Sequence, residues 1–215
     1  VIKTKIWEPY SFYKTFIGKK QNEKINASFL SENKKPSITE KISVWVRGNF
    51  FIPDARKFWI KPSVNHLTNY LKSNQVDAII SSGPPHSMHL IALGIKKNFP
   101  NIKWVADFRD PWTNIDFYKE LMLTADSDNK HKQLEKEVLL HADSVISIGN
   151  GMNEEFKNIL GKSPEKFTVI TNGFDEDDIY KEPLEKDKKF SIAHIGTLVK
   201  SRNPEVLWKV LSVLT

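Results

Sequence analysis

Short apolar runs alternate with helically spaced apolar residues from residue 76 to the end of the chain. The runs Val76–Ile80 and Lys103–Phe108 have the length of buried strands, and helically spaced residues lie between them. Two strands joined by a helix within about thirty residues form a βαβ unit with parallel strands. Three later runs, Ser144–Gly149, Phe167–Ile170 and Phe190–Ile195, extend the same alternation. The pattern therefore predicts an α/β fold with a parallel sheet.

Five helices are expected beside these strands, at 61–74, 86–98, 128–142, 150–160 and 204–214. Pro62 is placed in the first turn of the first helix, where its missing N–H is tolerated. Residues 1–62 are interpreted as irregular, because Lys19–Lys41 is rich in Lys, Asn and Ser and Pro36 interrupts it. Regular structure is thus predicted from about residue 61 onward.

The charged segment Asp175–Lys189, which carries Pro183, is interpreted as a linker. We therefore predict a first domain over residues 1–182 and, over residues 183–215, the linker and the opening β-α unit of a second domain. The first residue is not Met, no signal-peptide core follows it, and Glu205–Thr215 stops within a helical pattern. These features lead us to expect a segment of a longer protein.

Composition narrows the class of protein without selecting a function. Hydrophobic residues make up 40% and charged residues 27% of the 215 residues, as in ordinary globular proteins. The absence of Cys excludes disulfides and thiolate metal sites, and no apolar run approaches the roughly 18 residues of a membrane-spanning helix. A net charge of +6 is compatible with nucleic acid, anionic lipid or phosphate-bearing substrates. Because no nucleic-acid-binding motif or dense basic stripe appears, nucleic acid is not expected as a partner.

Aromatic and basic residues are interleaved within Lys41–Lys61. One interpretation is a surface that contacts an anionic membrane. The other is a loop whose aromatic side chains pack on the core while the charges stay solvated. The aromatic members are Trp45, Phe50, Phe51, Phe58 and Trp59, and the basic members are Arg47, Arg56, Lys57 and Lys61.

The first candidate site follows the apolar run that ends near Ser81. Gly83 permits a sharp turn or the close approach of a ligand, and the helix that begins at His86 offers free N–H groups to an anion. His86 and His89 lie three residues apart on one helix face, but no third ligand stands at zinc-site spacing, so no metal site is predicted. A solvent-facing His86 and a partly buried, hydrogen-bonded His89 are the alternative interpretation.

The second candidate site, Asp107–Trp112, follows the apolar run that ends at Phe108. Arg109 suits recognition of a phosphate or carboxylate, and Asp110 can accept the hydrogen bond of a substrate hydroxyl or act as a base. Because ligands bind beyond the carboxyl ends of parallel strands, both are candidate site residues. An internal Arg–Asp ion pair that braces the loop is the alternative.

Two later segments carry weaker signals. Asn172-Gly173 predicts a turn after a strand. Gly196 and Arg202 bound a loop between a predicted strand and helix, where a glycine and basic residues can hold a phosphate. This loop lacks the GxxxxGK[ST] spacing, and the chain contains no GxGxxG, HExxH or GxSxG motif.

Taken together, these segments resemble the GT-B glycosyltransferases of family 4. The resemblance rests on a strand ending in Ser-Gly-Pro-Pro at 82–85 and a strand ending in Asp-Phe-Arg-Asp-Pro-Trp at 107–112. Val169–Asp175 is similar to the family's NG-x-D passage into its second half. Ala193–Leu198 is similar to the first strand and donor loop of that half.

The resemblance implies a Rossmann-like parallel sheet with helices on both faces, forming the acceptor-binding half of an enzyme with two such halves. By analogy, Asp110 and His86 are candidate catalytic residues, and Gly196 and Arg202 approach the diphosphate of the donor. The candidate substrate-binding residues are Gly83, His86, Arg109, Asp110 and Asn172.

The resemblance also implies the reaction and its setting. A nucleotide-sugar is the expected donor, a glycan or lipid-linked molecule the acceptor, with retention of anomeric configuration and with no metal or other cofactor. The expected place is cell-surface polysaccharide biosynthesis at the cytoplasmic face of the membrane, in peripheral contact with anionic lipid. The family's opening strand, glycine-rich loop and E-x7-E glutamates are absent from this sequence, so we do not expect this chain alone to turn over substrate.

Two other functions stay open at this point. One is a non-catalytic Rossmann-like module that binds a glycan, a phosphate or a membrane. The other is a GT-B-shaped epimerase that acts on a nucleotide-sugar. An E-x7-E run in a second Rossmann-like unit would favour the transferase.

Overall fold

The computed structural model describes residues 3–4, 6, 37–161, 165–179, 187–196 and 203–214. They belong to two units, one ending at Asn172 and the other beginning at Gly173, and each is described by itself. The predicted domain boundary at residues 182 and 183 lies outside the described residues and stays a prediction. Within the described ranges, no helix has both the length and the apolar character needed to cross a membrane.

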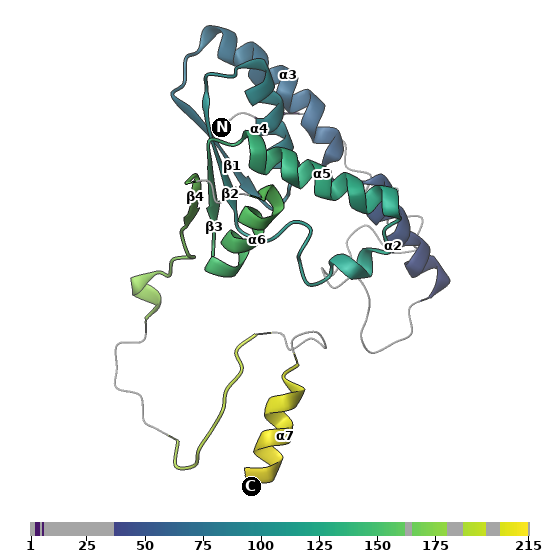
Figure 1. Ribbon diagram of the computed structural model, residues 1–215, viewed down its shortest axis with the longest axis vertical. Helices are drawn as coiled ribbons and strands as arrows, with labels where there is room; N and C mark the ends of the chain where they lie inside the picture. The colour runs from purple at the N-terminus through teal and green to yellow at the C-terminus, as the bar shows by residue number, and fades with distance from the viewer. Residues whose placement is uncertain are drawn as a thin grey trace. The chain divides into compact units, whose positions relative to one another are not determined.

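The first unit is built on a four-stranded parallel sheet in the order β1-β2-β3-β4 (Figure 1). The strands are β1 (Ala78–Gly83), β2 (Lys103–Phe108), β3 (Ser144–Ser147) and β4 (Phe167–Val169). The crossover helices are α4 (Ser87–Asn98), α5 (Ala125–His141) and α6 (Asn150–Leu160). Each crossover steps to the next strand in the same direction, and right-handed crossovers of this kind place their helices on one face. The predicted α/β fold with a Rossmann-like parallel sheet is confirmed.

The hydrophobic core lies between the sheet and these three helices. In β2, the alternate residues Trp104, Ala106 and Phe108 are completely buried because they point toward the helices. Phe156 of α6 packs in the same cluster. On the opposite face of the sheet, the side chain of Ile80 is 72% exposed. The crossover helices α4, α5 and α6 thus bury one face of the sheet.

Helix α2 (Ile38–Phe50) contradicts the prediction that residues 1–62 are irregular. It begins at a capping box: Ser37 Oγ accepts a hydrogen bond from the N–H of Glu40 at 3.2 Å, and the Glu40 carboxylate accepts one from the N–H of Ser37 at 2.8 Å. Helix α3 (Lys57–Ser73) also begins earlier than predicted, so Pro62 lies inside it rather than in its first turn. Lys41–Lys61 is therefore mostly helical and not a loop.

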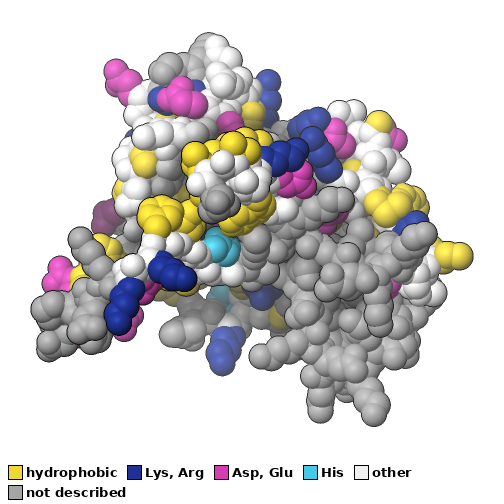
Figure 2. Space-filling view, turned by 90° about the horizontal axis from the view of Figure 1, so that it is seen from below, with side chains coloured by type: hydrophobic (Ala, Val, Ile, Leu, Met, Phe, Trp, Pro, Cys, Tyr) yellow, Lys and Arg dark blue, Asp and Glu magenta, His cyan; other side chains and the backbone are white. Residues whose placement is uncertain are grey.

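Most other boundaries agree with the sequence analysis, and one element does not form. The bounds of β2 and α6 are those predicted, and α7 (Glu205–Leu214) forms in the second unit. The predicted strand at Phe190–Ile195 is wrong: no strand forms there, and Phe190 and Ile195 are 90% and 98% exposed. A strand needs a neighbour for its backbone N–H and C=O groups, and none pairs with it in the described chain. Apolar side chains of α7 are exposed as well, among them Val206, Val213 and Leu214. Figure 2, a view from below, shows hydrophobic side chains in yellow on the surface.

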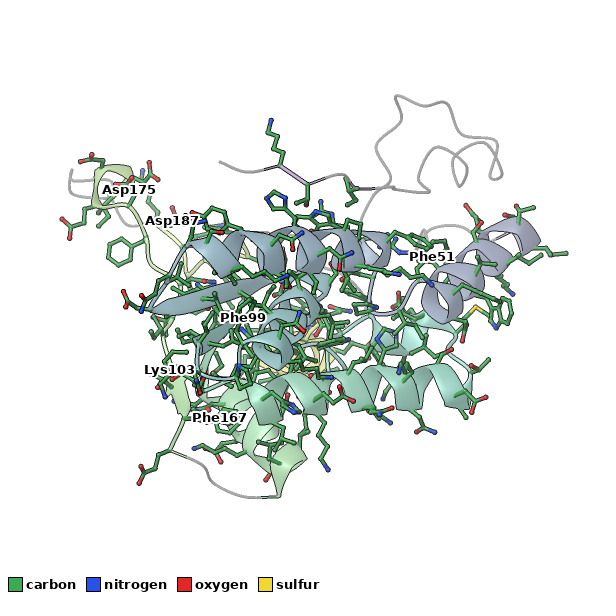
Figure 3. All side chains as sticks on the ribbon, turned by 90° about the horizontal axis from the view of Figure 1, so that it is seen from above. Phe51, Phe99, Lys103, Phe167, Asp175 and Asp187 are labelled. Carbon is green, nitrogen blue, oxygen red and sulfur yellow. The ribbon has the colours of Figure 1, made fainter. Side chains whose placement is uncertain are left out.

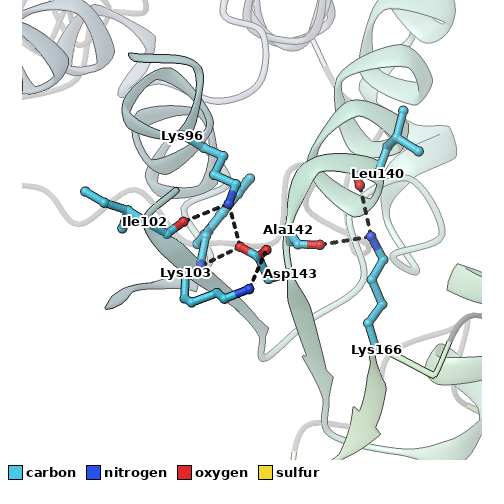
Figure 4. A network of polar contacts seen from close by, with 8 residues as sticks. Lys96, Ile102, Lys103, Leu140, Ala142, Asp143 and Lys166 are labelled. Carbon is cyan, nitrogen blue, oxygen red and sulfur yellow. Dashed lines mark hydrogen bonds and ion pairs between the residues drawn. The ribbon is translucent and has the colours of Figure 1, made fainter. Parts of the chain in front are cut away.

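Asp143 joins β2, β3 and α4 at the amino-terminal edge of the sheet (Figure 4). Its Oδ2 accepts hydrogen bonds from Lys96 Nζ and from the N–H of Trp104, both at 2.8 Å. Its Oδ1 lies 3.9 Å from Lys103 Nζ. Burial acts to raise the pKa of Asp143, but the hydrogen bonds from Lys96 and Trp104 outweigh it and hold the pKa below its usual value. These contacts close one edge of the sheet, and the candidate site lies at the other.

Candidate functional site

A pocket of about 500 Å³ lies beyond the carboxyl ends of β1 and β2. Its walls are α2, the turn Phe51–Arg56, the turn Pro84–His86, the loop that follows β2, and His131 of α5. Figure 3 shows Phe51 toward this end of the unit, with Phe99 and Lys103 toward the other. The pocket therefore occupies the edge of the sheet at which open α/β folds bind ligands.

The lining of the pocket combines aromatic faces with charged groups. Guanidinium groups donate hydrogen bonds and carboxylates accept them, and here the formal charges of two arginines and two aspartates cancel. Such a lining suits a neutral ligand that has an apolar face and several hydroxyl groups. The aromatic members are Phe51, Trp112, Phe117 and Tyr118, and the charged members are Arg47, Asp54, Arg56 and Asp110.

His86 lines the pocket as a buried, neutral imidazole. Its ring stacks on Trp112, with centroids 4.6 Å apart and planes inclined by 3°. Burial, and then the charge interactions with His89 and His131, lower the pKa of His86 to about 3. His86 is thus buried rather than solvent-facing, and at pH 7 it can accept one hydrogen bond and donate another. Its Nδ1 is buried and has no hydrogen-bond partner in the described part of the chain.

Gly83 does not line the pocket, but it leaves room for the buried ring of His89 beside it. A Cβ at residue 83 would lie 2.6 Å from Nε2 of His89, so only glycine leaves room for that imidazole. His89 is completely buried, burial lowers its pKa to about 3, and its Nδ1 lies 2.8 Å from Oγ of Ser81. Oγ of Ser81 also accepts a hydrogen bond from Trp104 Nε1 at 2.9 Å. The end of β1 is therefore fixed by a buried polar cluster.

Asp54 occupies the amino terminus of α4, which the sequence analysis predicts to be free for an anion. The N–H of Ser87 donates to Asp54 Oδ2 at 2.8 Å, and the N–H of Arg56 donates to Asp54 Oδ1 at 2.8 Å. A carboxylate is the charge that a helix amino terminus favours. The anion at this helix end therefore comes from the chain itself, from the turn between α2 and α3.

Arg109 and Asn172 belong to a second polar cluster, outside the lining of the pocket. Arg109 Nη1 lies 3.4 Å from Asp107 Oδ1, and Arg109 Nη2 donates to Oδ1 of Asn172. Ser82 Oγ donates to Asp107 Oδ2 at 2.7 Å. Because side chains alternate along β2, Asp107 faces away from the helices that bury Phe108. The structure thus brings Asp110 and His86 together in the pocket and joins Arg109 to Asn172 in a brace across the strand ends.

Three residues of α5 that the sequence analysis does not select hold the loop after β2. Trp112 Nε1 donates to His131 Nδ1 at 3.1 Å, and the side chain of Tyr118 donates to Asp128 Oδ1 at 2.9 Å. The hydroxyl of Thr113 donates to Glu135 Oε2 at 2.5 Å. The available signal is the spacing of Asp128, His131 and Glu135, which places them on one face of a helix.

Comparison with known families agrees with this geometry. The family described as Glycosyltransferase Family 4 matches residues 24–178, which is more than half of the 215 residues. The chain belongs to glycosyltransferase family 4. The predicted resemblance is therefore confirmed, and the match includes every residue of the pocket. A search of the curated proteins returned no match.

The donor-side candidates of this glycosyltransferase lie beyond the matched segment. Gly196 has a φ of 137°, a conformation that favours glycine, and belongs to the second unit. Arg202 lies outside the described residues. In the part of the chain that the structure describes, no group of three or more His, Asp or Glu side chains could hold a metal ion.

Proposed function

We propose that this family 4 glycosyltransferase moves a hexosyl group from a nucleotide-sugar to a hydroxyl of a glycan or lipid-linked acceptor, with retention of configuration. The acceptor oxygen forms a bond to the anomeric carbon, the bond from that carbon to the diphosphate breaks, and the hydroxyl proton is released. Family membership supports the transferase chemistry. The motif resemblance supports the donor, the retention and a role in cell-surface polysaccharide assembly, with no resident metal or cofactor.

The observation that carries the proposal is the meeting of Asp110, His86 and Trp112 in one pocket at the ligand-binding edge of the sheet. In the proposal, the Asp110 carboxylate accepts a hydrogen bond from the acceptor hydroxyl, and the neutral His86 orients a second hydroxyl. Phe117 and Tyr118, which are partly exposed in the pocket, offer apolar faces to the sugar ring. Arg109 and Asn172 keep the strand ends in register, and Gly196 and Arg202 are assigned to the donor diphosphate.

A donor screen with full-length protein tests the proposal. Release of nucleoside diphosphate and labelling of the acceptor are measured for wild type, Asp110→Asn and His86→Ala, with circular dichroism as the check on folding. We expect transfer to fall at least about a hundredfold in both variants, since general acid–base and orienting groups contribute on that scale. Asp126→Asn, an exposed carboxylate on α5, is the matched control. Transfer at the wild-type rate by Asp110→Asn would refute the assignment of the active site to this pocket. Sugar binding without transfer by the wild-type protein would favour a non-catalytic binding module.

We further propose that the protein works at the inner face of the membrane and that α2 contacts anionic lipid. Ile38, Ile42 and Trp45 are exposed at spacings of four and three residues, with Ile38 77% exposed. The buried residues of α2, Val44 and Gly48 among them, lie on the other side of the helix. An apolar stripe that faces solvent on a protein with net charge +6 is typical of a helix lying in a lipid interface.

Co-sedimentation with vesicles tests this contact. The chain is expected to sediment with vesicles of phosphatidylglycerol and phosphatidylcholine, more weakly with phosphatidylcholine alone, and less as salt increases. The double variant Ile42→Ser, Trp45→Ser is expected to lose most of the binding. Leu140→Ser, at an exposed apolar side chain of α5, is expected to retain it. Equal sedimentation of the double variant and wild type would show that α2 is not the contact.

A further inference from the structure

The loop from Trp112 to Leu121 forms one wall of the pocket. Apart from the short helix η1 (Tyr118–Leu121), it has no regular structure, so its shape depends on contacts with neighbouring elements. The side chains that it contributes to the pocket are Trp112, Ile115, Phe117, Tyr118 and Leu121. Whatever holds this loop therefore determines the shape of the binding surface.

Helix α5 holds the loop at three places along one face. Asp128, His131 and Glu135 are separated by three and four residues, which is the spacing of a single helix face. Each accepts a hydrogen bond from a different loop side chain: the Tyr118 hydroxyl at 2.9 Å, Trp112 Nε1 at 3.1 Å and the Thr113 hydroxyl at 2.5 Å. The three contacts span the loop from its beginning to the start of η1.

The contact between Trp112 and His131 is buried, and that between Thr113 and Glu135 is partly buried. Glu135 is 2% exposed, and burial raises its pKa, while hydrogen bonds from Thr113 and from the N–H of Trp112 act in the opposite direction. For His131 burial lowers the pKa, against the hydrogen bond with the backbone of Gly48 and the charges of Asp128 and Asp54, which act to raise it. Because Trp112 Nε1 donates to Nδ1, His131 presents its acceptor nitrogen to the loop. Loss of either partner would leave a buried polar group without its hydrogen bond.

The contact with His131 fixes the orientation of Trp112. His131 accepts a hydrogen bond from the indole N–H, while His86 stacks against the face of the same ring with centroids 4.6 Å apart. An indole held both at its N–H and on one face cannot rotate without breaking one of the two contacts. The direction of this aromatic surface in the pocket is therefore set from α5.

We propose that Asp128 and Glu135 are positioning residues for acceptor binding, acting through the loop that carries Trp112 and Tyr118, and that His131, which itself lines the pocket, holds the same loop. The proposal rests on the assignment of the pocket to the acceptor. Asp128 and Glu135 are not among the residues that line the pocket, so their effect on an acceptor passes through the loop. Their substitution changes the affinity for the acceptor and leaves the chemical step nearly unchanged.

Hydrogen–deuterium exchange on the 215-residue chain tests the contacts without a substrate. Glu135→Leu and Asp128→Ala are expected to speed exchange of loop amides at 112–121 by at least about tenfold, because each removes a contact that restrains the loop. Glu135→Gln and Asp128→Asn keep an acceptor oxygen and are expected to restore slow exchange. Glu137→Leu, on the same helix at a partly exposed carboxylate that pairs with Lys97, is the matched control and leaves the loop unchanged. Unchanged exchange in both Glu135→Leu and Asp128→Ala overturns the proposal.

Kinetics of the full-length protein test the consequence for binding. Glu135→Leu and Asp128→Ala are expected to raise KM for the acceptor about tenfold with kcat within about twofold of wild type, and the amide variants are expected to lower KM again. Asp128 is partly exposed, so Asp128→Ala provides the test if Glu135→Leu does not fold. Faster exchange with an unchanged acceptor KM would show that α5 holds the loop but that the pocket does not bind the acceptor. Unchanged exchange with loss of transfer in Asp110→Asn would leave the proposed function in place without the α5 contacts.

Discussion

Gly83→Ala is the smallest change that tests the packing of His89 and Ser81 at the end of β1, next to the pocket. The added Cβ would lie 2.6 Å from Nε2 of His89, closer than real Cβ atoms approach, and 3.1 Å from Cδ2 of the same ring, which is a tight contact. The imidazole has little room to move, since it is completely buried and stacks on Phe108 with centroids 4.2 Å apart. Any movement also stretches its 2.8 Å contact with Ser81 Oγ. The single methyl group therefore strains the polar cluster at the end of β1.

The size of the effect follows from three contributions. Overpacking a well-packed site costs about 1–3 kcal/mol of unfolding free energy. A weakened buried hydrogen bond adds about 0.5–1.5 kcal/mol. Replacing glycine lowers the entropy of the unfolded chain and offsets about 0.4–1 kcal/mol where the native φ suits alanine, as the φ of Gly83 does. The expected net loss is about 0.5–4 kcal/mol, or a fall in Tm of about 1–16 °C for a chain of this size.

Thermal and urea unfolding followed by circular dichroism measure this loss. Gly151→Ala is the matched control, because a Cβ there meets no atom within 4 Å and should leave stability unchanged or slightly higher. In the background of His89→Ala, the cost of Gly83→Ala should disappear, because the obstructing ring is gone. A Gly83→Ala protein that unfolds with wild-type midpoints, or a cost that persists without the His89 ring, would refute the reasoning.

Three further changes have expected outcomes. The pKa values of His86 and His89 are about 3 in the folded chain, against an ordinary histidine value of 6.5, so acid protonates the unfolded chain first. The contribution of these two residues to the free energy of unfolding is therefore complete above about pH 6.5 and falls toward pH 3, by up to about 1.4 kcal/mol per pH unit for each imidazole. A urea midpoint that does not decrease between pH 7 and pH 5 would contradict this. Asp143→Ala leaves the N–H of Trp104 without an acceptor and removes the charged partner of Lys96, whose Nζ keeps only its hydrogen bond to the carbonyl oxygen of Ile102. The substitution should cost about 1–3 kcal/mol in urea unfolding, whereas an unchanged midpoint would show that solvent replaces the carboxylate. Ser37→Ala removes the cap of α2 and should cost about 1 kcal/mol, seen as faster amide exchange confined to that helix.

The elements that could be predicted from sequence are those with both a clear period and clear ends. The strand Lys103–Phe108 and the helix Asn150–Leu160 have the predicted bounds because turn residues and a change of period mark them. Helix α2 was not predicted, because its apolar residues Ile38 and Ile42 face solvent and its surroundings are polar, although the Ser-x-x-Glu capping box at Ser37 is readable. The strand predicted at 190–195 did not form because a strand depends on a partner that a local pattern does not contain.

The candidate site could likewise be predicted from the sequence only in part. The meeting of His86 and Asp110 could be predicted, since both follow strands that end at one edge of a parallel sheet. The contact of Asp54 with the N–H of Ser87 could not, because 33 residues separate them and only the packed turn brings them together. The contact between Trp112 and His131 likewise depends on how α5 lies against the loop, which no spacing in the sequence determines.

The carboxylate of Asp54 at the end of α4 has a consequence for inhibitor chemistry. A phosphate or sulfonate aimed at that helix end must displace a group that the N–H groups of Ser87 and Arg56 already hold at 2.8 Å. An uncharged polyol analogue meets no such competition and can use the aromatic faces and carboxylates of the pocket directly. Fragment libraries for this pocket should therefore be rich in neutral sugar mimics. Anionic fragments should bind at the amino terminus of α4 only when Asp54 is removed, as in the variant Asp54→Ala.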